Sequence, residues 1–225
     1  MNGDEQQEST ESSPTDLAVE LRNDDLLLSV FEQSQDLGFL GPGPVVDHVE
    51  HACGFLPVLD RSGDVLDLGS GGGLPGLVLV RALPAVSFVL LDAMERRCAF
   101  LEHAAEQLGV TGRVSVVCGR AEELARDPEL RGRFATVVTR SFGAPAVTAE
   151  CAAGFLRTPH GRLVVSEPPE PDPVRWPAEG LARLGLRAVE RHVGAGVTVQ
   201  VLEAVSPLDD RFPRRTGVPA KRPLF

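Results

Sequence analysis

The sequence predicts an α/β fold in which a seven-stranded, mostly parallel sheet carries helices on both faces. Short apolar runs alternate with segments of helical periodicity, which is the pattern of repeated β-α units. The first five runs are strongly apolar, as expected for parallel strands buried on both faces. The last two runs are separated only by residues 194–196, Gly-Ala-Gly, which predicts an antiparallel hairpin at one edge.

Two helices are expected ahead of the sheet. Residues 1–14 are polar, rich in Glu, Gln and Ser, and are predicted to form a disordered acidic tail. An amphipathic helix then begins at Ser13-Pro14 and ends before the glycines and prolines of residues 38–44. Its apolar face consists of Leu17, Leu21, Leu27, Leu28 and Phe31. A second helix is expected at residues 45–56, so residues 15–60 are interpreted as a helical cap.

The sheet itself is expected within residues 61–206, which we interpret as one cofactor-binding domain. Helices are expected between the first six strands. The expected strands are residues 64–68, 87–92, 114–118, 135–140, 161–166, 186–193 and 197–204. Residues 207–225 follow as a basic carboxyl-terminal tail.

A glycine-rich loop joins the first strand to the next helix. Asp67 lies two residues before its first glycine, which gives the pattern D-x-G-x-G-x-G of S-adenosylmethionine (AdoMet) loops. From Gly71 to Gly76 the same residues also fit a dinucleotide loop, and a tight turn without a ligand is a third interpretation. The residues expected to line the methionine side of AdoMet are Gly69, Ser70, Gly71, Gly73 and Leu74.

The next two strands favour AdoMet over a dinucleotide. The second strand ends at Asp92, where a carboxylate accepts hydrogen bonds from a ribose. Capping of the following helix is the alternative role of Asp92. A short acidic turn follows the third strand, at the place where methyltransferases hold adenine by a backbone N–H and a carboxylate. We therefore expect Ala121 and Glu122 to contact the adenine.

Four segments resemble the RsmG (GidB) family in sequence and order. Residues 69–76 read GSGGGLPG, 91–97 read LDAMERR, 119–123 read GRAEE and 139–142 read TRSF. Residues 211–224 are also similar to the carboxyl terminus of many members. This family comprises bacterial 16S rRNA guanine-N7 methyltransferases. The resemblance implies a Rossmann-like, class I AdoMet-dependent methyltransferase with amino-terminal helices, acting on 16S ribosomal RNA or the small ribosomal subunit.

The implied reaction needs alignment more than acid-base catalysis. The AdoMet methyl group is attacked in line, and guanine N7 already presents a lone pair, so no catalytic base is expected. Arg140 follows the fourth strand and is expected to pair with the methionine carboxylate or with a substrate phosphate. Support of a loop carboxylate is its alternative role.

Two segments depart from the family pattern. Residues 40–51 keep a histidine and little else of the family's Trp-Asn, Asn-Leu-Thr and Arg-His-x-x-Asp-Ser segments. The pair His48-x-x-His51 is interpreted as a solvated helix face. Ser166 and Glu167 stand where the family has Lys-Gly, so an anion replaces a cation near the expected pocket. These departures leave two alternatives open: a small-molecule methyltransferase, and a non-catalytic AdoMet-binding module associated with the ribosome.

Charge is unevenly distributed along the chain. The net charge of −10 argues against a simple nucleic-acid-binding protein. Residues 211–225, however, hold five basic residues and no acidic one, so the chain can present one cationic surface. The residues expected to bind substrate are Arg140, Arg214, Arg215 and Lys221. Packing of the tail against the protein's own surface is the alternative.

Composition predicts a cytoplasmic protein. No apolar segment approaches 18 residues and no leader pattern begins the chain. The four cysteines form no C-x-x-C pair and are interpreted as reduced core residues, and no metal site is expected. We expect a monomer.

Overall fold

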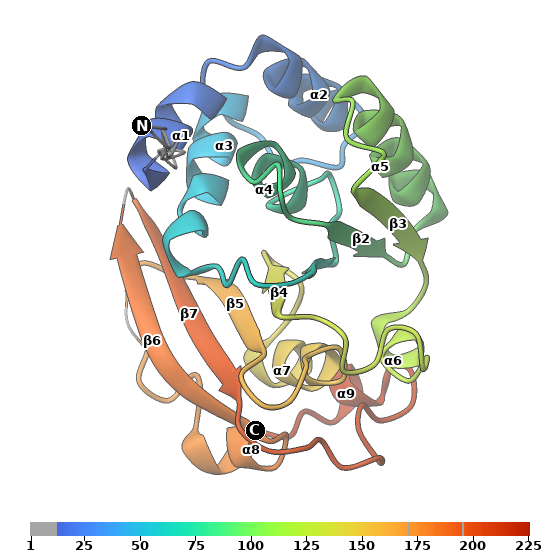
Figure 1. The fold of residues 1–225 in the computed structure, drawn as a ribbon. Helices are drawn as coiled ribbons and strands as arrows, with labels where there is room; N and C mark the ends of the chain where they lie inside the picture. Colours follow the sequence, from blue (N-terminus) through green and yellow to red (C-terminus); the bar gives the residue numbers. More distant parts are fainter. Residues whose placement is uncertain (1–12, 171, 195) are drawn as a thin grey trace, which may run out of the picture.

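The structure is a computed structural model that describes residues 13–170, 172–194 and 196–225. Its centre is a seven-stranded sheet with the strand order β3-β2-β1-β4-β5-β7-β6 (Figure 1). Neighbouring strands are parallel except at β7, which is antiparallel to β5 and β6. The strands are β1 (Val65–Leu68), β2 (Phe88–Asp92), β3 (Val114–Cys118), β4 (Thr136–Thr139), β5 (Arg162–Glu167), β6 (Leu186–Gly194) and β7 (Val197–Ala204). The predicted architecture is confirmed, and each predicted strand end lies within one residue of the observed one.

Helices cover both faces of the sheet. Those from α1 to α5 lie on one face, while α6, α7 and α8 lie on the other, with α9 against α7 (Figure 1). The helices are α1 (Pro14–Leu21), α2 (Asp25–Asp36), α3 (Val45–Cys53), the 3-10 turn η1 (Leu56–Val58), α4 (Gly76–Ala82), α5 (Glu95–Gln107), α6 (Ala121–Leu124), α7 (Pro145–Ala153), α8 (Ala178–Ala182) and α9 (Val218–Lys221). None of the described helices is long and apolar enough to cross a membrane.

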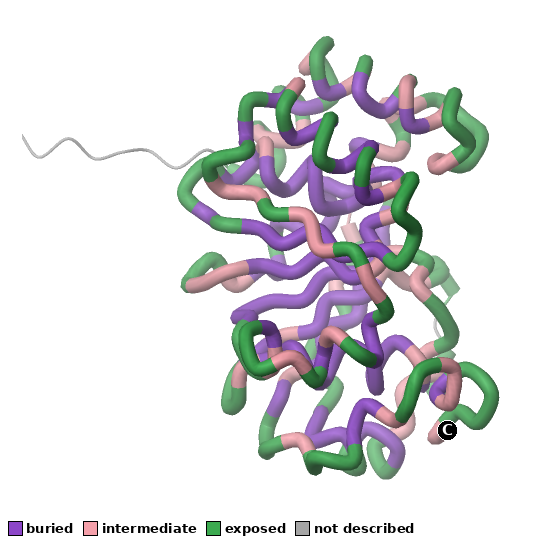
Figure 2. The backbone as a smooth tube through the Cα atoms, turned by 90° about the vertical axis from the view of Figure 1, so that its right-hand side faces the viewer, coloured by how far each residue is buried: buried purple, intermediate pink, exposed green. Residues whose placement is uncertain are grey.

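Each strand of the sheet's centre supplies two hydrophobic cores. Val65 packs into the core under α4, whereas the next residue, Leu66, packs into the core against α7. This division follows from the alternation of side chains along a strand. The buried backbone forms the central layers of the molecule in Figure 2, and exposed residues lie mainly at its periphery.

The expectation of four core cysteines is wrong for one of them. Cys53, Cys98 and Cys151 are buried, but Cys118 is exposed. Cys118 is the last residue of β3, an edge strand of the sheet. An edge strand has a neighbour on only one side, so its apolar residues are covered less completely than those of a central strand.

The single long helix predicted after Ser13 is two helices in the structure. The helix α1 ends at Leu21, and α2 begins at Asp25 after a short turn. Asp24 causes the break: its Oδ1 accepts a hydrogen bond from the Leu27 N–H at 3.0 Å and thereby caps α2. Its Oδ2 accepts from Nε of Arg81, on α4, at 2.9 Å. The apolar spacing that predicted one helix runs across both because each contributes to the same core.

The expected acidic tail lies mostly outside the described residues. Residues 1–12 of this tail are outside the part of the chain that the structure describes. Ser13 and Pro14 are described and begin α1, where the Ser13 Oγ accepts a hydrogen bond from the Asp16 N–H. The helical segment therefore begins one residue before the predicted boundary at residue 15.

Replacing Asp24 with Ala removes a helix cap and an ion pair. We expect the free energy of unfolding to fall by about 1–2 kcal/mol in urea denaturation at pH 7. Burial opposes ionisation of Asp24, but Arg81 and the Leu27 N–H outweigh it and lower its pKa below 3.8. The contribution of Asp24 is therefore complete above that usual pKa and is lost as the pH falls through the lowered one.

Asp25→Ala is the matched control, because Asp25 is the exposed acid next in sequence. Its removal is expected to change the unfolding free energy by about 0.5 kcal/mol or less. Equal losses in the two variants would show that Asp24 does not stabilise the start of α2.

Candidate active site

The glycine loop folds over the carboxyl end of β2. The N–H groups of Gly69 and Ser70 donate to the Leu91 carbonyl at 2.8 and 2.9 Å. The Gly71 N–H donates to Oδ2 of Asp92 at 2.9 Å. The loop therefore lies at the carboxyl ends of neighbouring parallel strands, where open α/β sheets bind their ligands.

One glycine of the loop is required by the helical cap. The Ser34 hydroxyl, from α2, donates to the Gly72 carbonyl at 3.0 Å. A Cβ atom on residue 72 would overlap this hydroxyl and would lie 2.9 Å from the Phe39 carbonyl oxygen. Gly71 is different, since the nearest atom to a Cβ there would be the Gly69 oxygen at 3.7 Å. The helical cap therefore packs directly against Gly72, whereas Gly71 has room for a side-chain Cβ atom.

Asp67 supports the loop from below. This carboxylate is fully buried, and its Oδ2 accepts from the Gly76 N–H at 2.9 Å. Within the described part of the chain its Oδ1 has no hydrogen-bond partner. Burial, with a smaller contribution from the nearby charge of Asp92, raises the pKa of Asp67 from 3.8 to about 7. Asp67 therefore acts in the framework of the loop.

The alternative role of Asp92 as the cap of α5 is wrong, because Met94 stands at that N-cap and no side chain caps the helix. Asp92 instead holds the glycine loop and the turn that follows β2. Its side chain is only 5% exposed, and Oδ1 accepts from the Met94 N–H at 2.9 Å just ahead of α5. Its Oδ2 holds the Gly71 N–H and lies 3.6 Å from an Nη1 of Arg97. Each oxygen of a carboxylate has a second lone pair, so these contacts leave Asp92 able to accept further hydrogen bonds.

A pocket of about 520 Å³ opens beside Asp92, a size within the range of small-molecule sites. Four residues predicted at the cofactor line it: Gly69, Asp92, Ala121 and Glu122. Phe142 and Ala220 are among the lining residues that the sequence did not assign to the cofactor. Asp92 is the last residue of β2, Gly69 directly follows β1, and Ala121 and Glu122 begin α6 after β3. Phe142 and Ala220 come from the segment after β4 and from α9 in the tail.

Five predicted cofactor residues lie outside the pocket walls: Ser70, Gly71, Gly73, Leu74 and Arg140. The Ser70 hydroxyl is turned inward and donates to the Asp67 carbonyl at 3.0 Å. Leu74 belongs to the hydrophobic core beneath the loop. Gly71 adjoins the pocket through its hydrogen bond with Asp92. Ser70, Leu74 and Gly71 therefore contribute to the conformation of the loop through these internal contacts.

Arg140 lies at the carboxyl end of β4 and faces helix α3. Its Nη2 donates to Nδ1 of His48 at 3.1 Å, and Nε2 of His48 is 3.3 Å from the Gly41 carbonyl. These partners assign the tautomer of His48: Nδ1 accepts and Nε2 carries the proton. The Nη1 of Arg140 is buried without a partner among the described residues.

His51 completes the same cluster. Its Nε2 is 2.9 Å from the Ser166 hydroxyl oxygen, at the end of β5. Burial, together with the charge of Arg140 and the proximity of His48, lowers the pKa of His51 to about 4, so it is neutral at pH 7. The interpretation of His48 and His51 as a solvated face is therefore wrong. Their spacing of three residues places both on one side of α3, a signal that the sequence already contained.

Two charged positions differ from expectation. Glu167 does not present an unpaired anion, because Nε of Arg175 lies 3.0 Å from its Oε1 and 2.8 Å from its Oε2. Arg214 was expected to bind substrate, but its guanidinium holds the fully buried Glu150 through both oxygens. This pairing turns Arg214 toward the interior and assigns it to the fold. Arg215 and Lys221 are exposed.

Asp67 makes stability depend on pH in an unusual direction. Between pH 4 and pH 7 the folded chain retains a proton that the unfolded chain releases. Ionisation of Asp67 therefore lowers the free energy of unfolding as the pH rises across this interval. We expect Asp67→Asn, which cannot ionise, to lack this decrease. Urea denaturation at pH 5 and pH 8 measures it, and equal pH dependence in both proteins would contradict the raised pKa.

Comparison with known proteins agrees with this geometry. The GidB family model, described as rRNA small subunit methyltransferase G, matches residues 44–166. The ribosomal RNA small subunit methyltransferase G of Deinococcus deserti is 38% identical over 174 residues, which cover 74% of this chain and 70% of the relative. That of Rubrobacter xylanophilus is 34% identical over 212 residues, which cover 88% of this chain and 80% of the relative.

A solved structure supports the fold independently. The O-methyltransferase from Bacillus cereus, crystallised in complex with SAH, superposes with a TM-score of 0.56 at 17% identity, over 81% of this chain and 91% of that chain. The span matched by the family model contains the glycine loop, Asp92, the acidic turn, Arg140 and the two histidines of α3. The chain belongs to the GidB family, the rRNA small subunit methyltransferase G proteins.

Proposed function

We propose that this protein binds AdoMet in the pocket beside Asp92 and transfers its methyl group to N7 of a guanine in 16S ribosomal RNA. The observation that carries the proposal is the convergence of Gly69, Asp92, Ala121 and Glu122 on one pocket. These residues are up to 53 positions apart in sequence, from 69 to 122, and each was expected at the cofactor for a separate reason. In the proposal Asp92 accepts from the ribose hydroxyls and Gly69 lies on the methionine side.

The side chains of the pocket suit a reaction that depends on alignment. Bound AdoMet supplies an electrophilic methyl group, and guanine N7 supplies the lone pair, so no proton needs to be removed before attack. Cys151 lines the pocket but does not act as a nucleophile, because burial and then the charges of Glu122 and Glu150 raise its pKa to about 12. Arg140 lies outside the walls of this pocket, and its Nη1 is buried without a partner among the described residues. In the proposal this group donates to the methionine carboxylate or to a substrate phosphate.

Three exposed cations of the tail support an RNA substrate. Arg215, Lys221 and Arg222 are exposed, and they flank Ala220, which lines the pocket. Related proteins are named as ribosomal RNA small subunit methyltransferases, which supports the proposed substrate. We propose a cytoplasmic location because the proposed substrate is ribosomal. The small-molecule alternative rested partly on Glu167, and its ion pair with Arg175 neutralises that anion.

Asp92→Ala tests the cofactor site. Loss of a charge-assisted hydrogen bond to the ribose is expected to weaken AdoMet binding by about 1.5–3 kcal/mol, measured by calorimetric titration. Glu95→Ala is the matched control, because Glu95 is an exposed acid at the start of α5 outside the pocket. Unchanged affinity in Asp92→Ala would place the ribose elsewhere. In cells lacking the gene, N7-methylguanine in 16S rRNA is expected to return with the wild-type protein and not with Asp92→Ala.

The double variant Lys221→Ala/Arg222→Ala tests the RNA surface. We expect the slope of log affinity against log salt for 16S rRNA to decrease by about 0.7–0.9 for each phosphate that the variant can no longer neutralise. The double variant Arg187→Ala/Arg191→Ala removes the same charge from β6, at the far edge of the sheet, and is expected to leave the slope unchanged. Equal effects of the two double variants would indicate a general response to net charge.

A further inference from the structure

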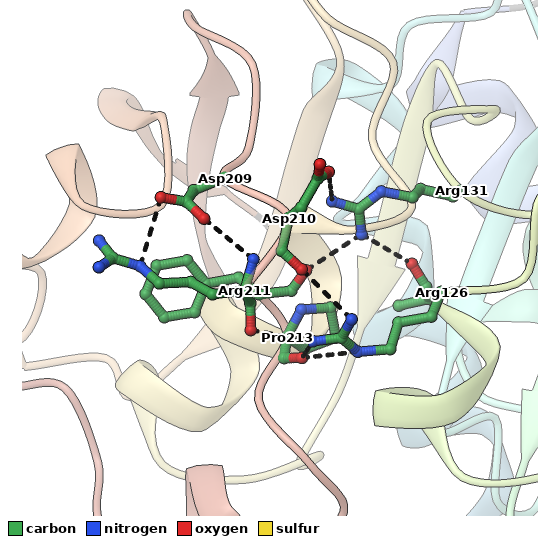
Figure 3. A network of polar contacts seen from close by, with 8 residues as sticks. Arg126, Arg131, Asp209, Asp210, Arg211 and Pro213 are labelled. Atoms are coloured by element: carbon green, nitrogen blue, oxygen red, sulfur yellow. Dashed lines mark hydrogen bonds and ion pairs between the residues drawn. The ribbon is translucent and has the colours of Figure 1, made fainter.

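The carboxyl-terminal tail is built into the protein beside α6 and α7 (Figure 1). Arg126, in the turn after α6, donates to three backbone carbonyls of the tail. Its guanidinium contacts the carbonyls of Pro213 at 2.6 Å, Arg211 at 2.9 Å and Asp210 at 3.2 Å (Figure 3). Arg131 adds a hydrogen bond to the Phe212 carbonyl, and the Phe212 side chain lies in the hydrophobic core. This segment therefore has a fixed position.

A second group of contacts continues toward the pocket. The Glu150 carboxylate accepts from the Arg214 backbone N–H at 2.8 Å as well as from its guanidinium. Two residues further, the Thr216 hydroxyl donates to Oε1 of Glu123 at 2.7 Å. Each contact joins the tail to a helix that borders the pocket, α7 in the first case and α6 in the second.

The last contact reaches a residue of the pocket itself. The Gly217 N–H donates to Oε1 of Glu122 at 2.9 Å, and Glu122 is only 5% exposed. Burial opposes the charge of Glu122, but this N–H and the neighbouring Arg120 lower its pKa, so the carboxylate is ionised at pH 7. Gly217 has a left-handed φ of +77°, which suits glycine, and it precedes α9, which places Ala220 on the pocket wall.

We infer that the tail is a wall of the cofactor pocket and that Glu122 acts as a positioning residue, which supports cofactor binding by holding Gly217. This inference rests on the proposed binding of AdoMet. It replaces the expectation that Glu122 itself selects the adenine. Because binding couplings are reciprocal, a cofactor that binds better when the tail is docked must also stabilise the docked tail.

A double-mutant cycle distinguishes action through the tail from direct contact. Glu122→Ala removes the acceptor, and Gly217→Pro removes the donor and excludes a positive φ. Calorimetric titration with S-adenosylhomocysteine gives the affinities of the wild type, both single variants and the double variant. We expect each single variant to bind about fivefold or more weakly, and the double variant to bind no more weakly than the worse single one.

Two further variants separate a loss of affinity caused by the tail from one caused by misfolding. Gly217→Ala retains the N–H but strains the left-handed backbone, and we expect a smaller loss of affinity in the same direction. Gly109→Ala is its matched control: Gly109 has a φ of +66°, a Cβ there meets no atom within 4 Å, and it follows the end of α5 away from the pocket. Its affinity is expected to equal that of the wild type.

Hydrogen exchange supplies the reciprocal measurement. S-adenosylhomocysteine is expected to slow exchange of the amides of residues 214–222 in the wild type and to have little effect on them in Glu122→Ala. The inference would be overturned if the losses of affinity in the two single variants multiplied in the double variant, or if the ligand left the exchange rates of the tail amides unchanged. Either result would assign Glu122 to direct contact with the cofactor. Failure of the wild type to bind S-adenosylhomocysteine would instead reject the proposed cofactor site.

Discussion

The arrangement of the site depends on two carboxylates that hold the glycine loop at its two ends. Asp92 accepts from the N–H of Gly71, and Asp67 accepts from the N–H of Gly76. The first contact brings the loop against the end of β2, and the second sets the start of α4. Both carboxyl groups are buried, and in a buried environment hydrogen bonds are strong. A buried polar group without a hydrogen-bond partner destabilises the fold. The pocket beside Asp92 is lined by Gly69, the first residue of the loop that these contacts hold.

Segments from both ends of the chain complete the site that the sheet begins. Ser34 of α2 rests on Gly72, and His48 of α3 accepts from Arg140 at the end of β4. From the other end, Gly217 donates to Glu122 beside the pocket. The glycine loop, Arg140 and the pocket residue Glu122 are therefore each contacted by an element outside the central α/β unit.

Charge pairing lets an acidic chain keep a local positive surface. The Glu150 and Glu167 carboxylates are paired with Arg214 and Arg175, so their negative charge is compensated where it is buried. Among the described residues, the exposed tail cations Arg215, Lys221 and Arg222 have no such acidic partner, whereas Arg211 pairs with Asp209. The net charge of −10 is therefore a poor guide to the electrostatics around the pocket.

The sequence by itself determined the strands, their order of appearance and the glycine loop, because runs such as Val65–Leu68 are apolar at nearly every position and local patterns alone specify them. It also marked Asp92 and the acidic turn, since a carboxylate at the end of a parallel strand points to one edge of the sheet. Local pattern did not reveal the break at Asp24, the pairing of Arg214 with Glu150 or the cluster around His51. The cap that Asp24 provides for the Leu27 N–H is local, three residues away. Its ion pair with Arg81, the pairing of Arg214 and the contact of His51 instead join residues 57 to 115 positions apart, so only the tertiary structure decided them. The physical reason is that the roles of charged side chains follow from the groups that surround them after folding.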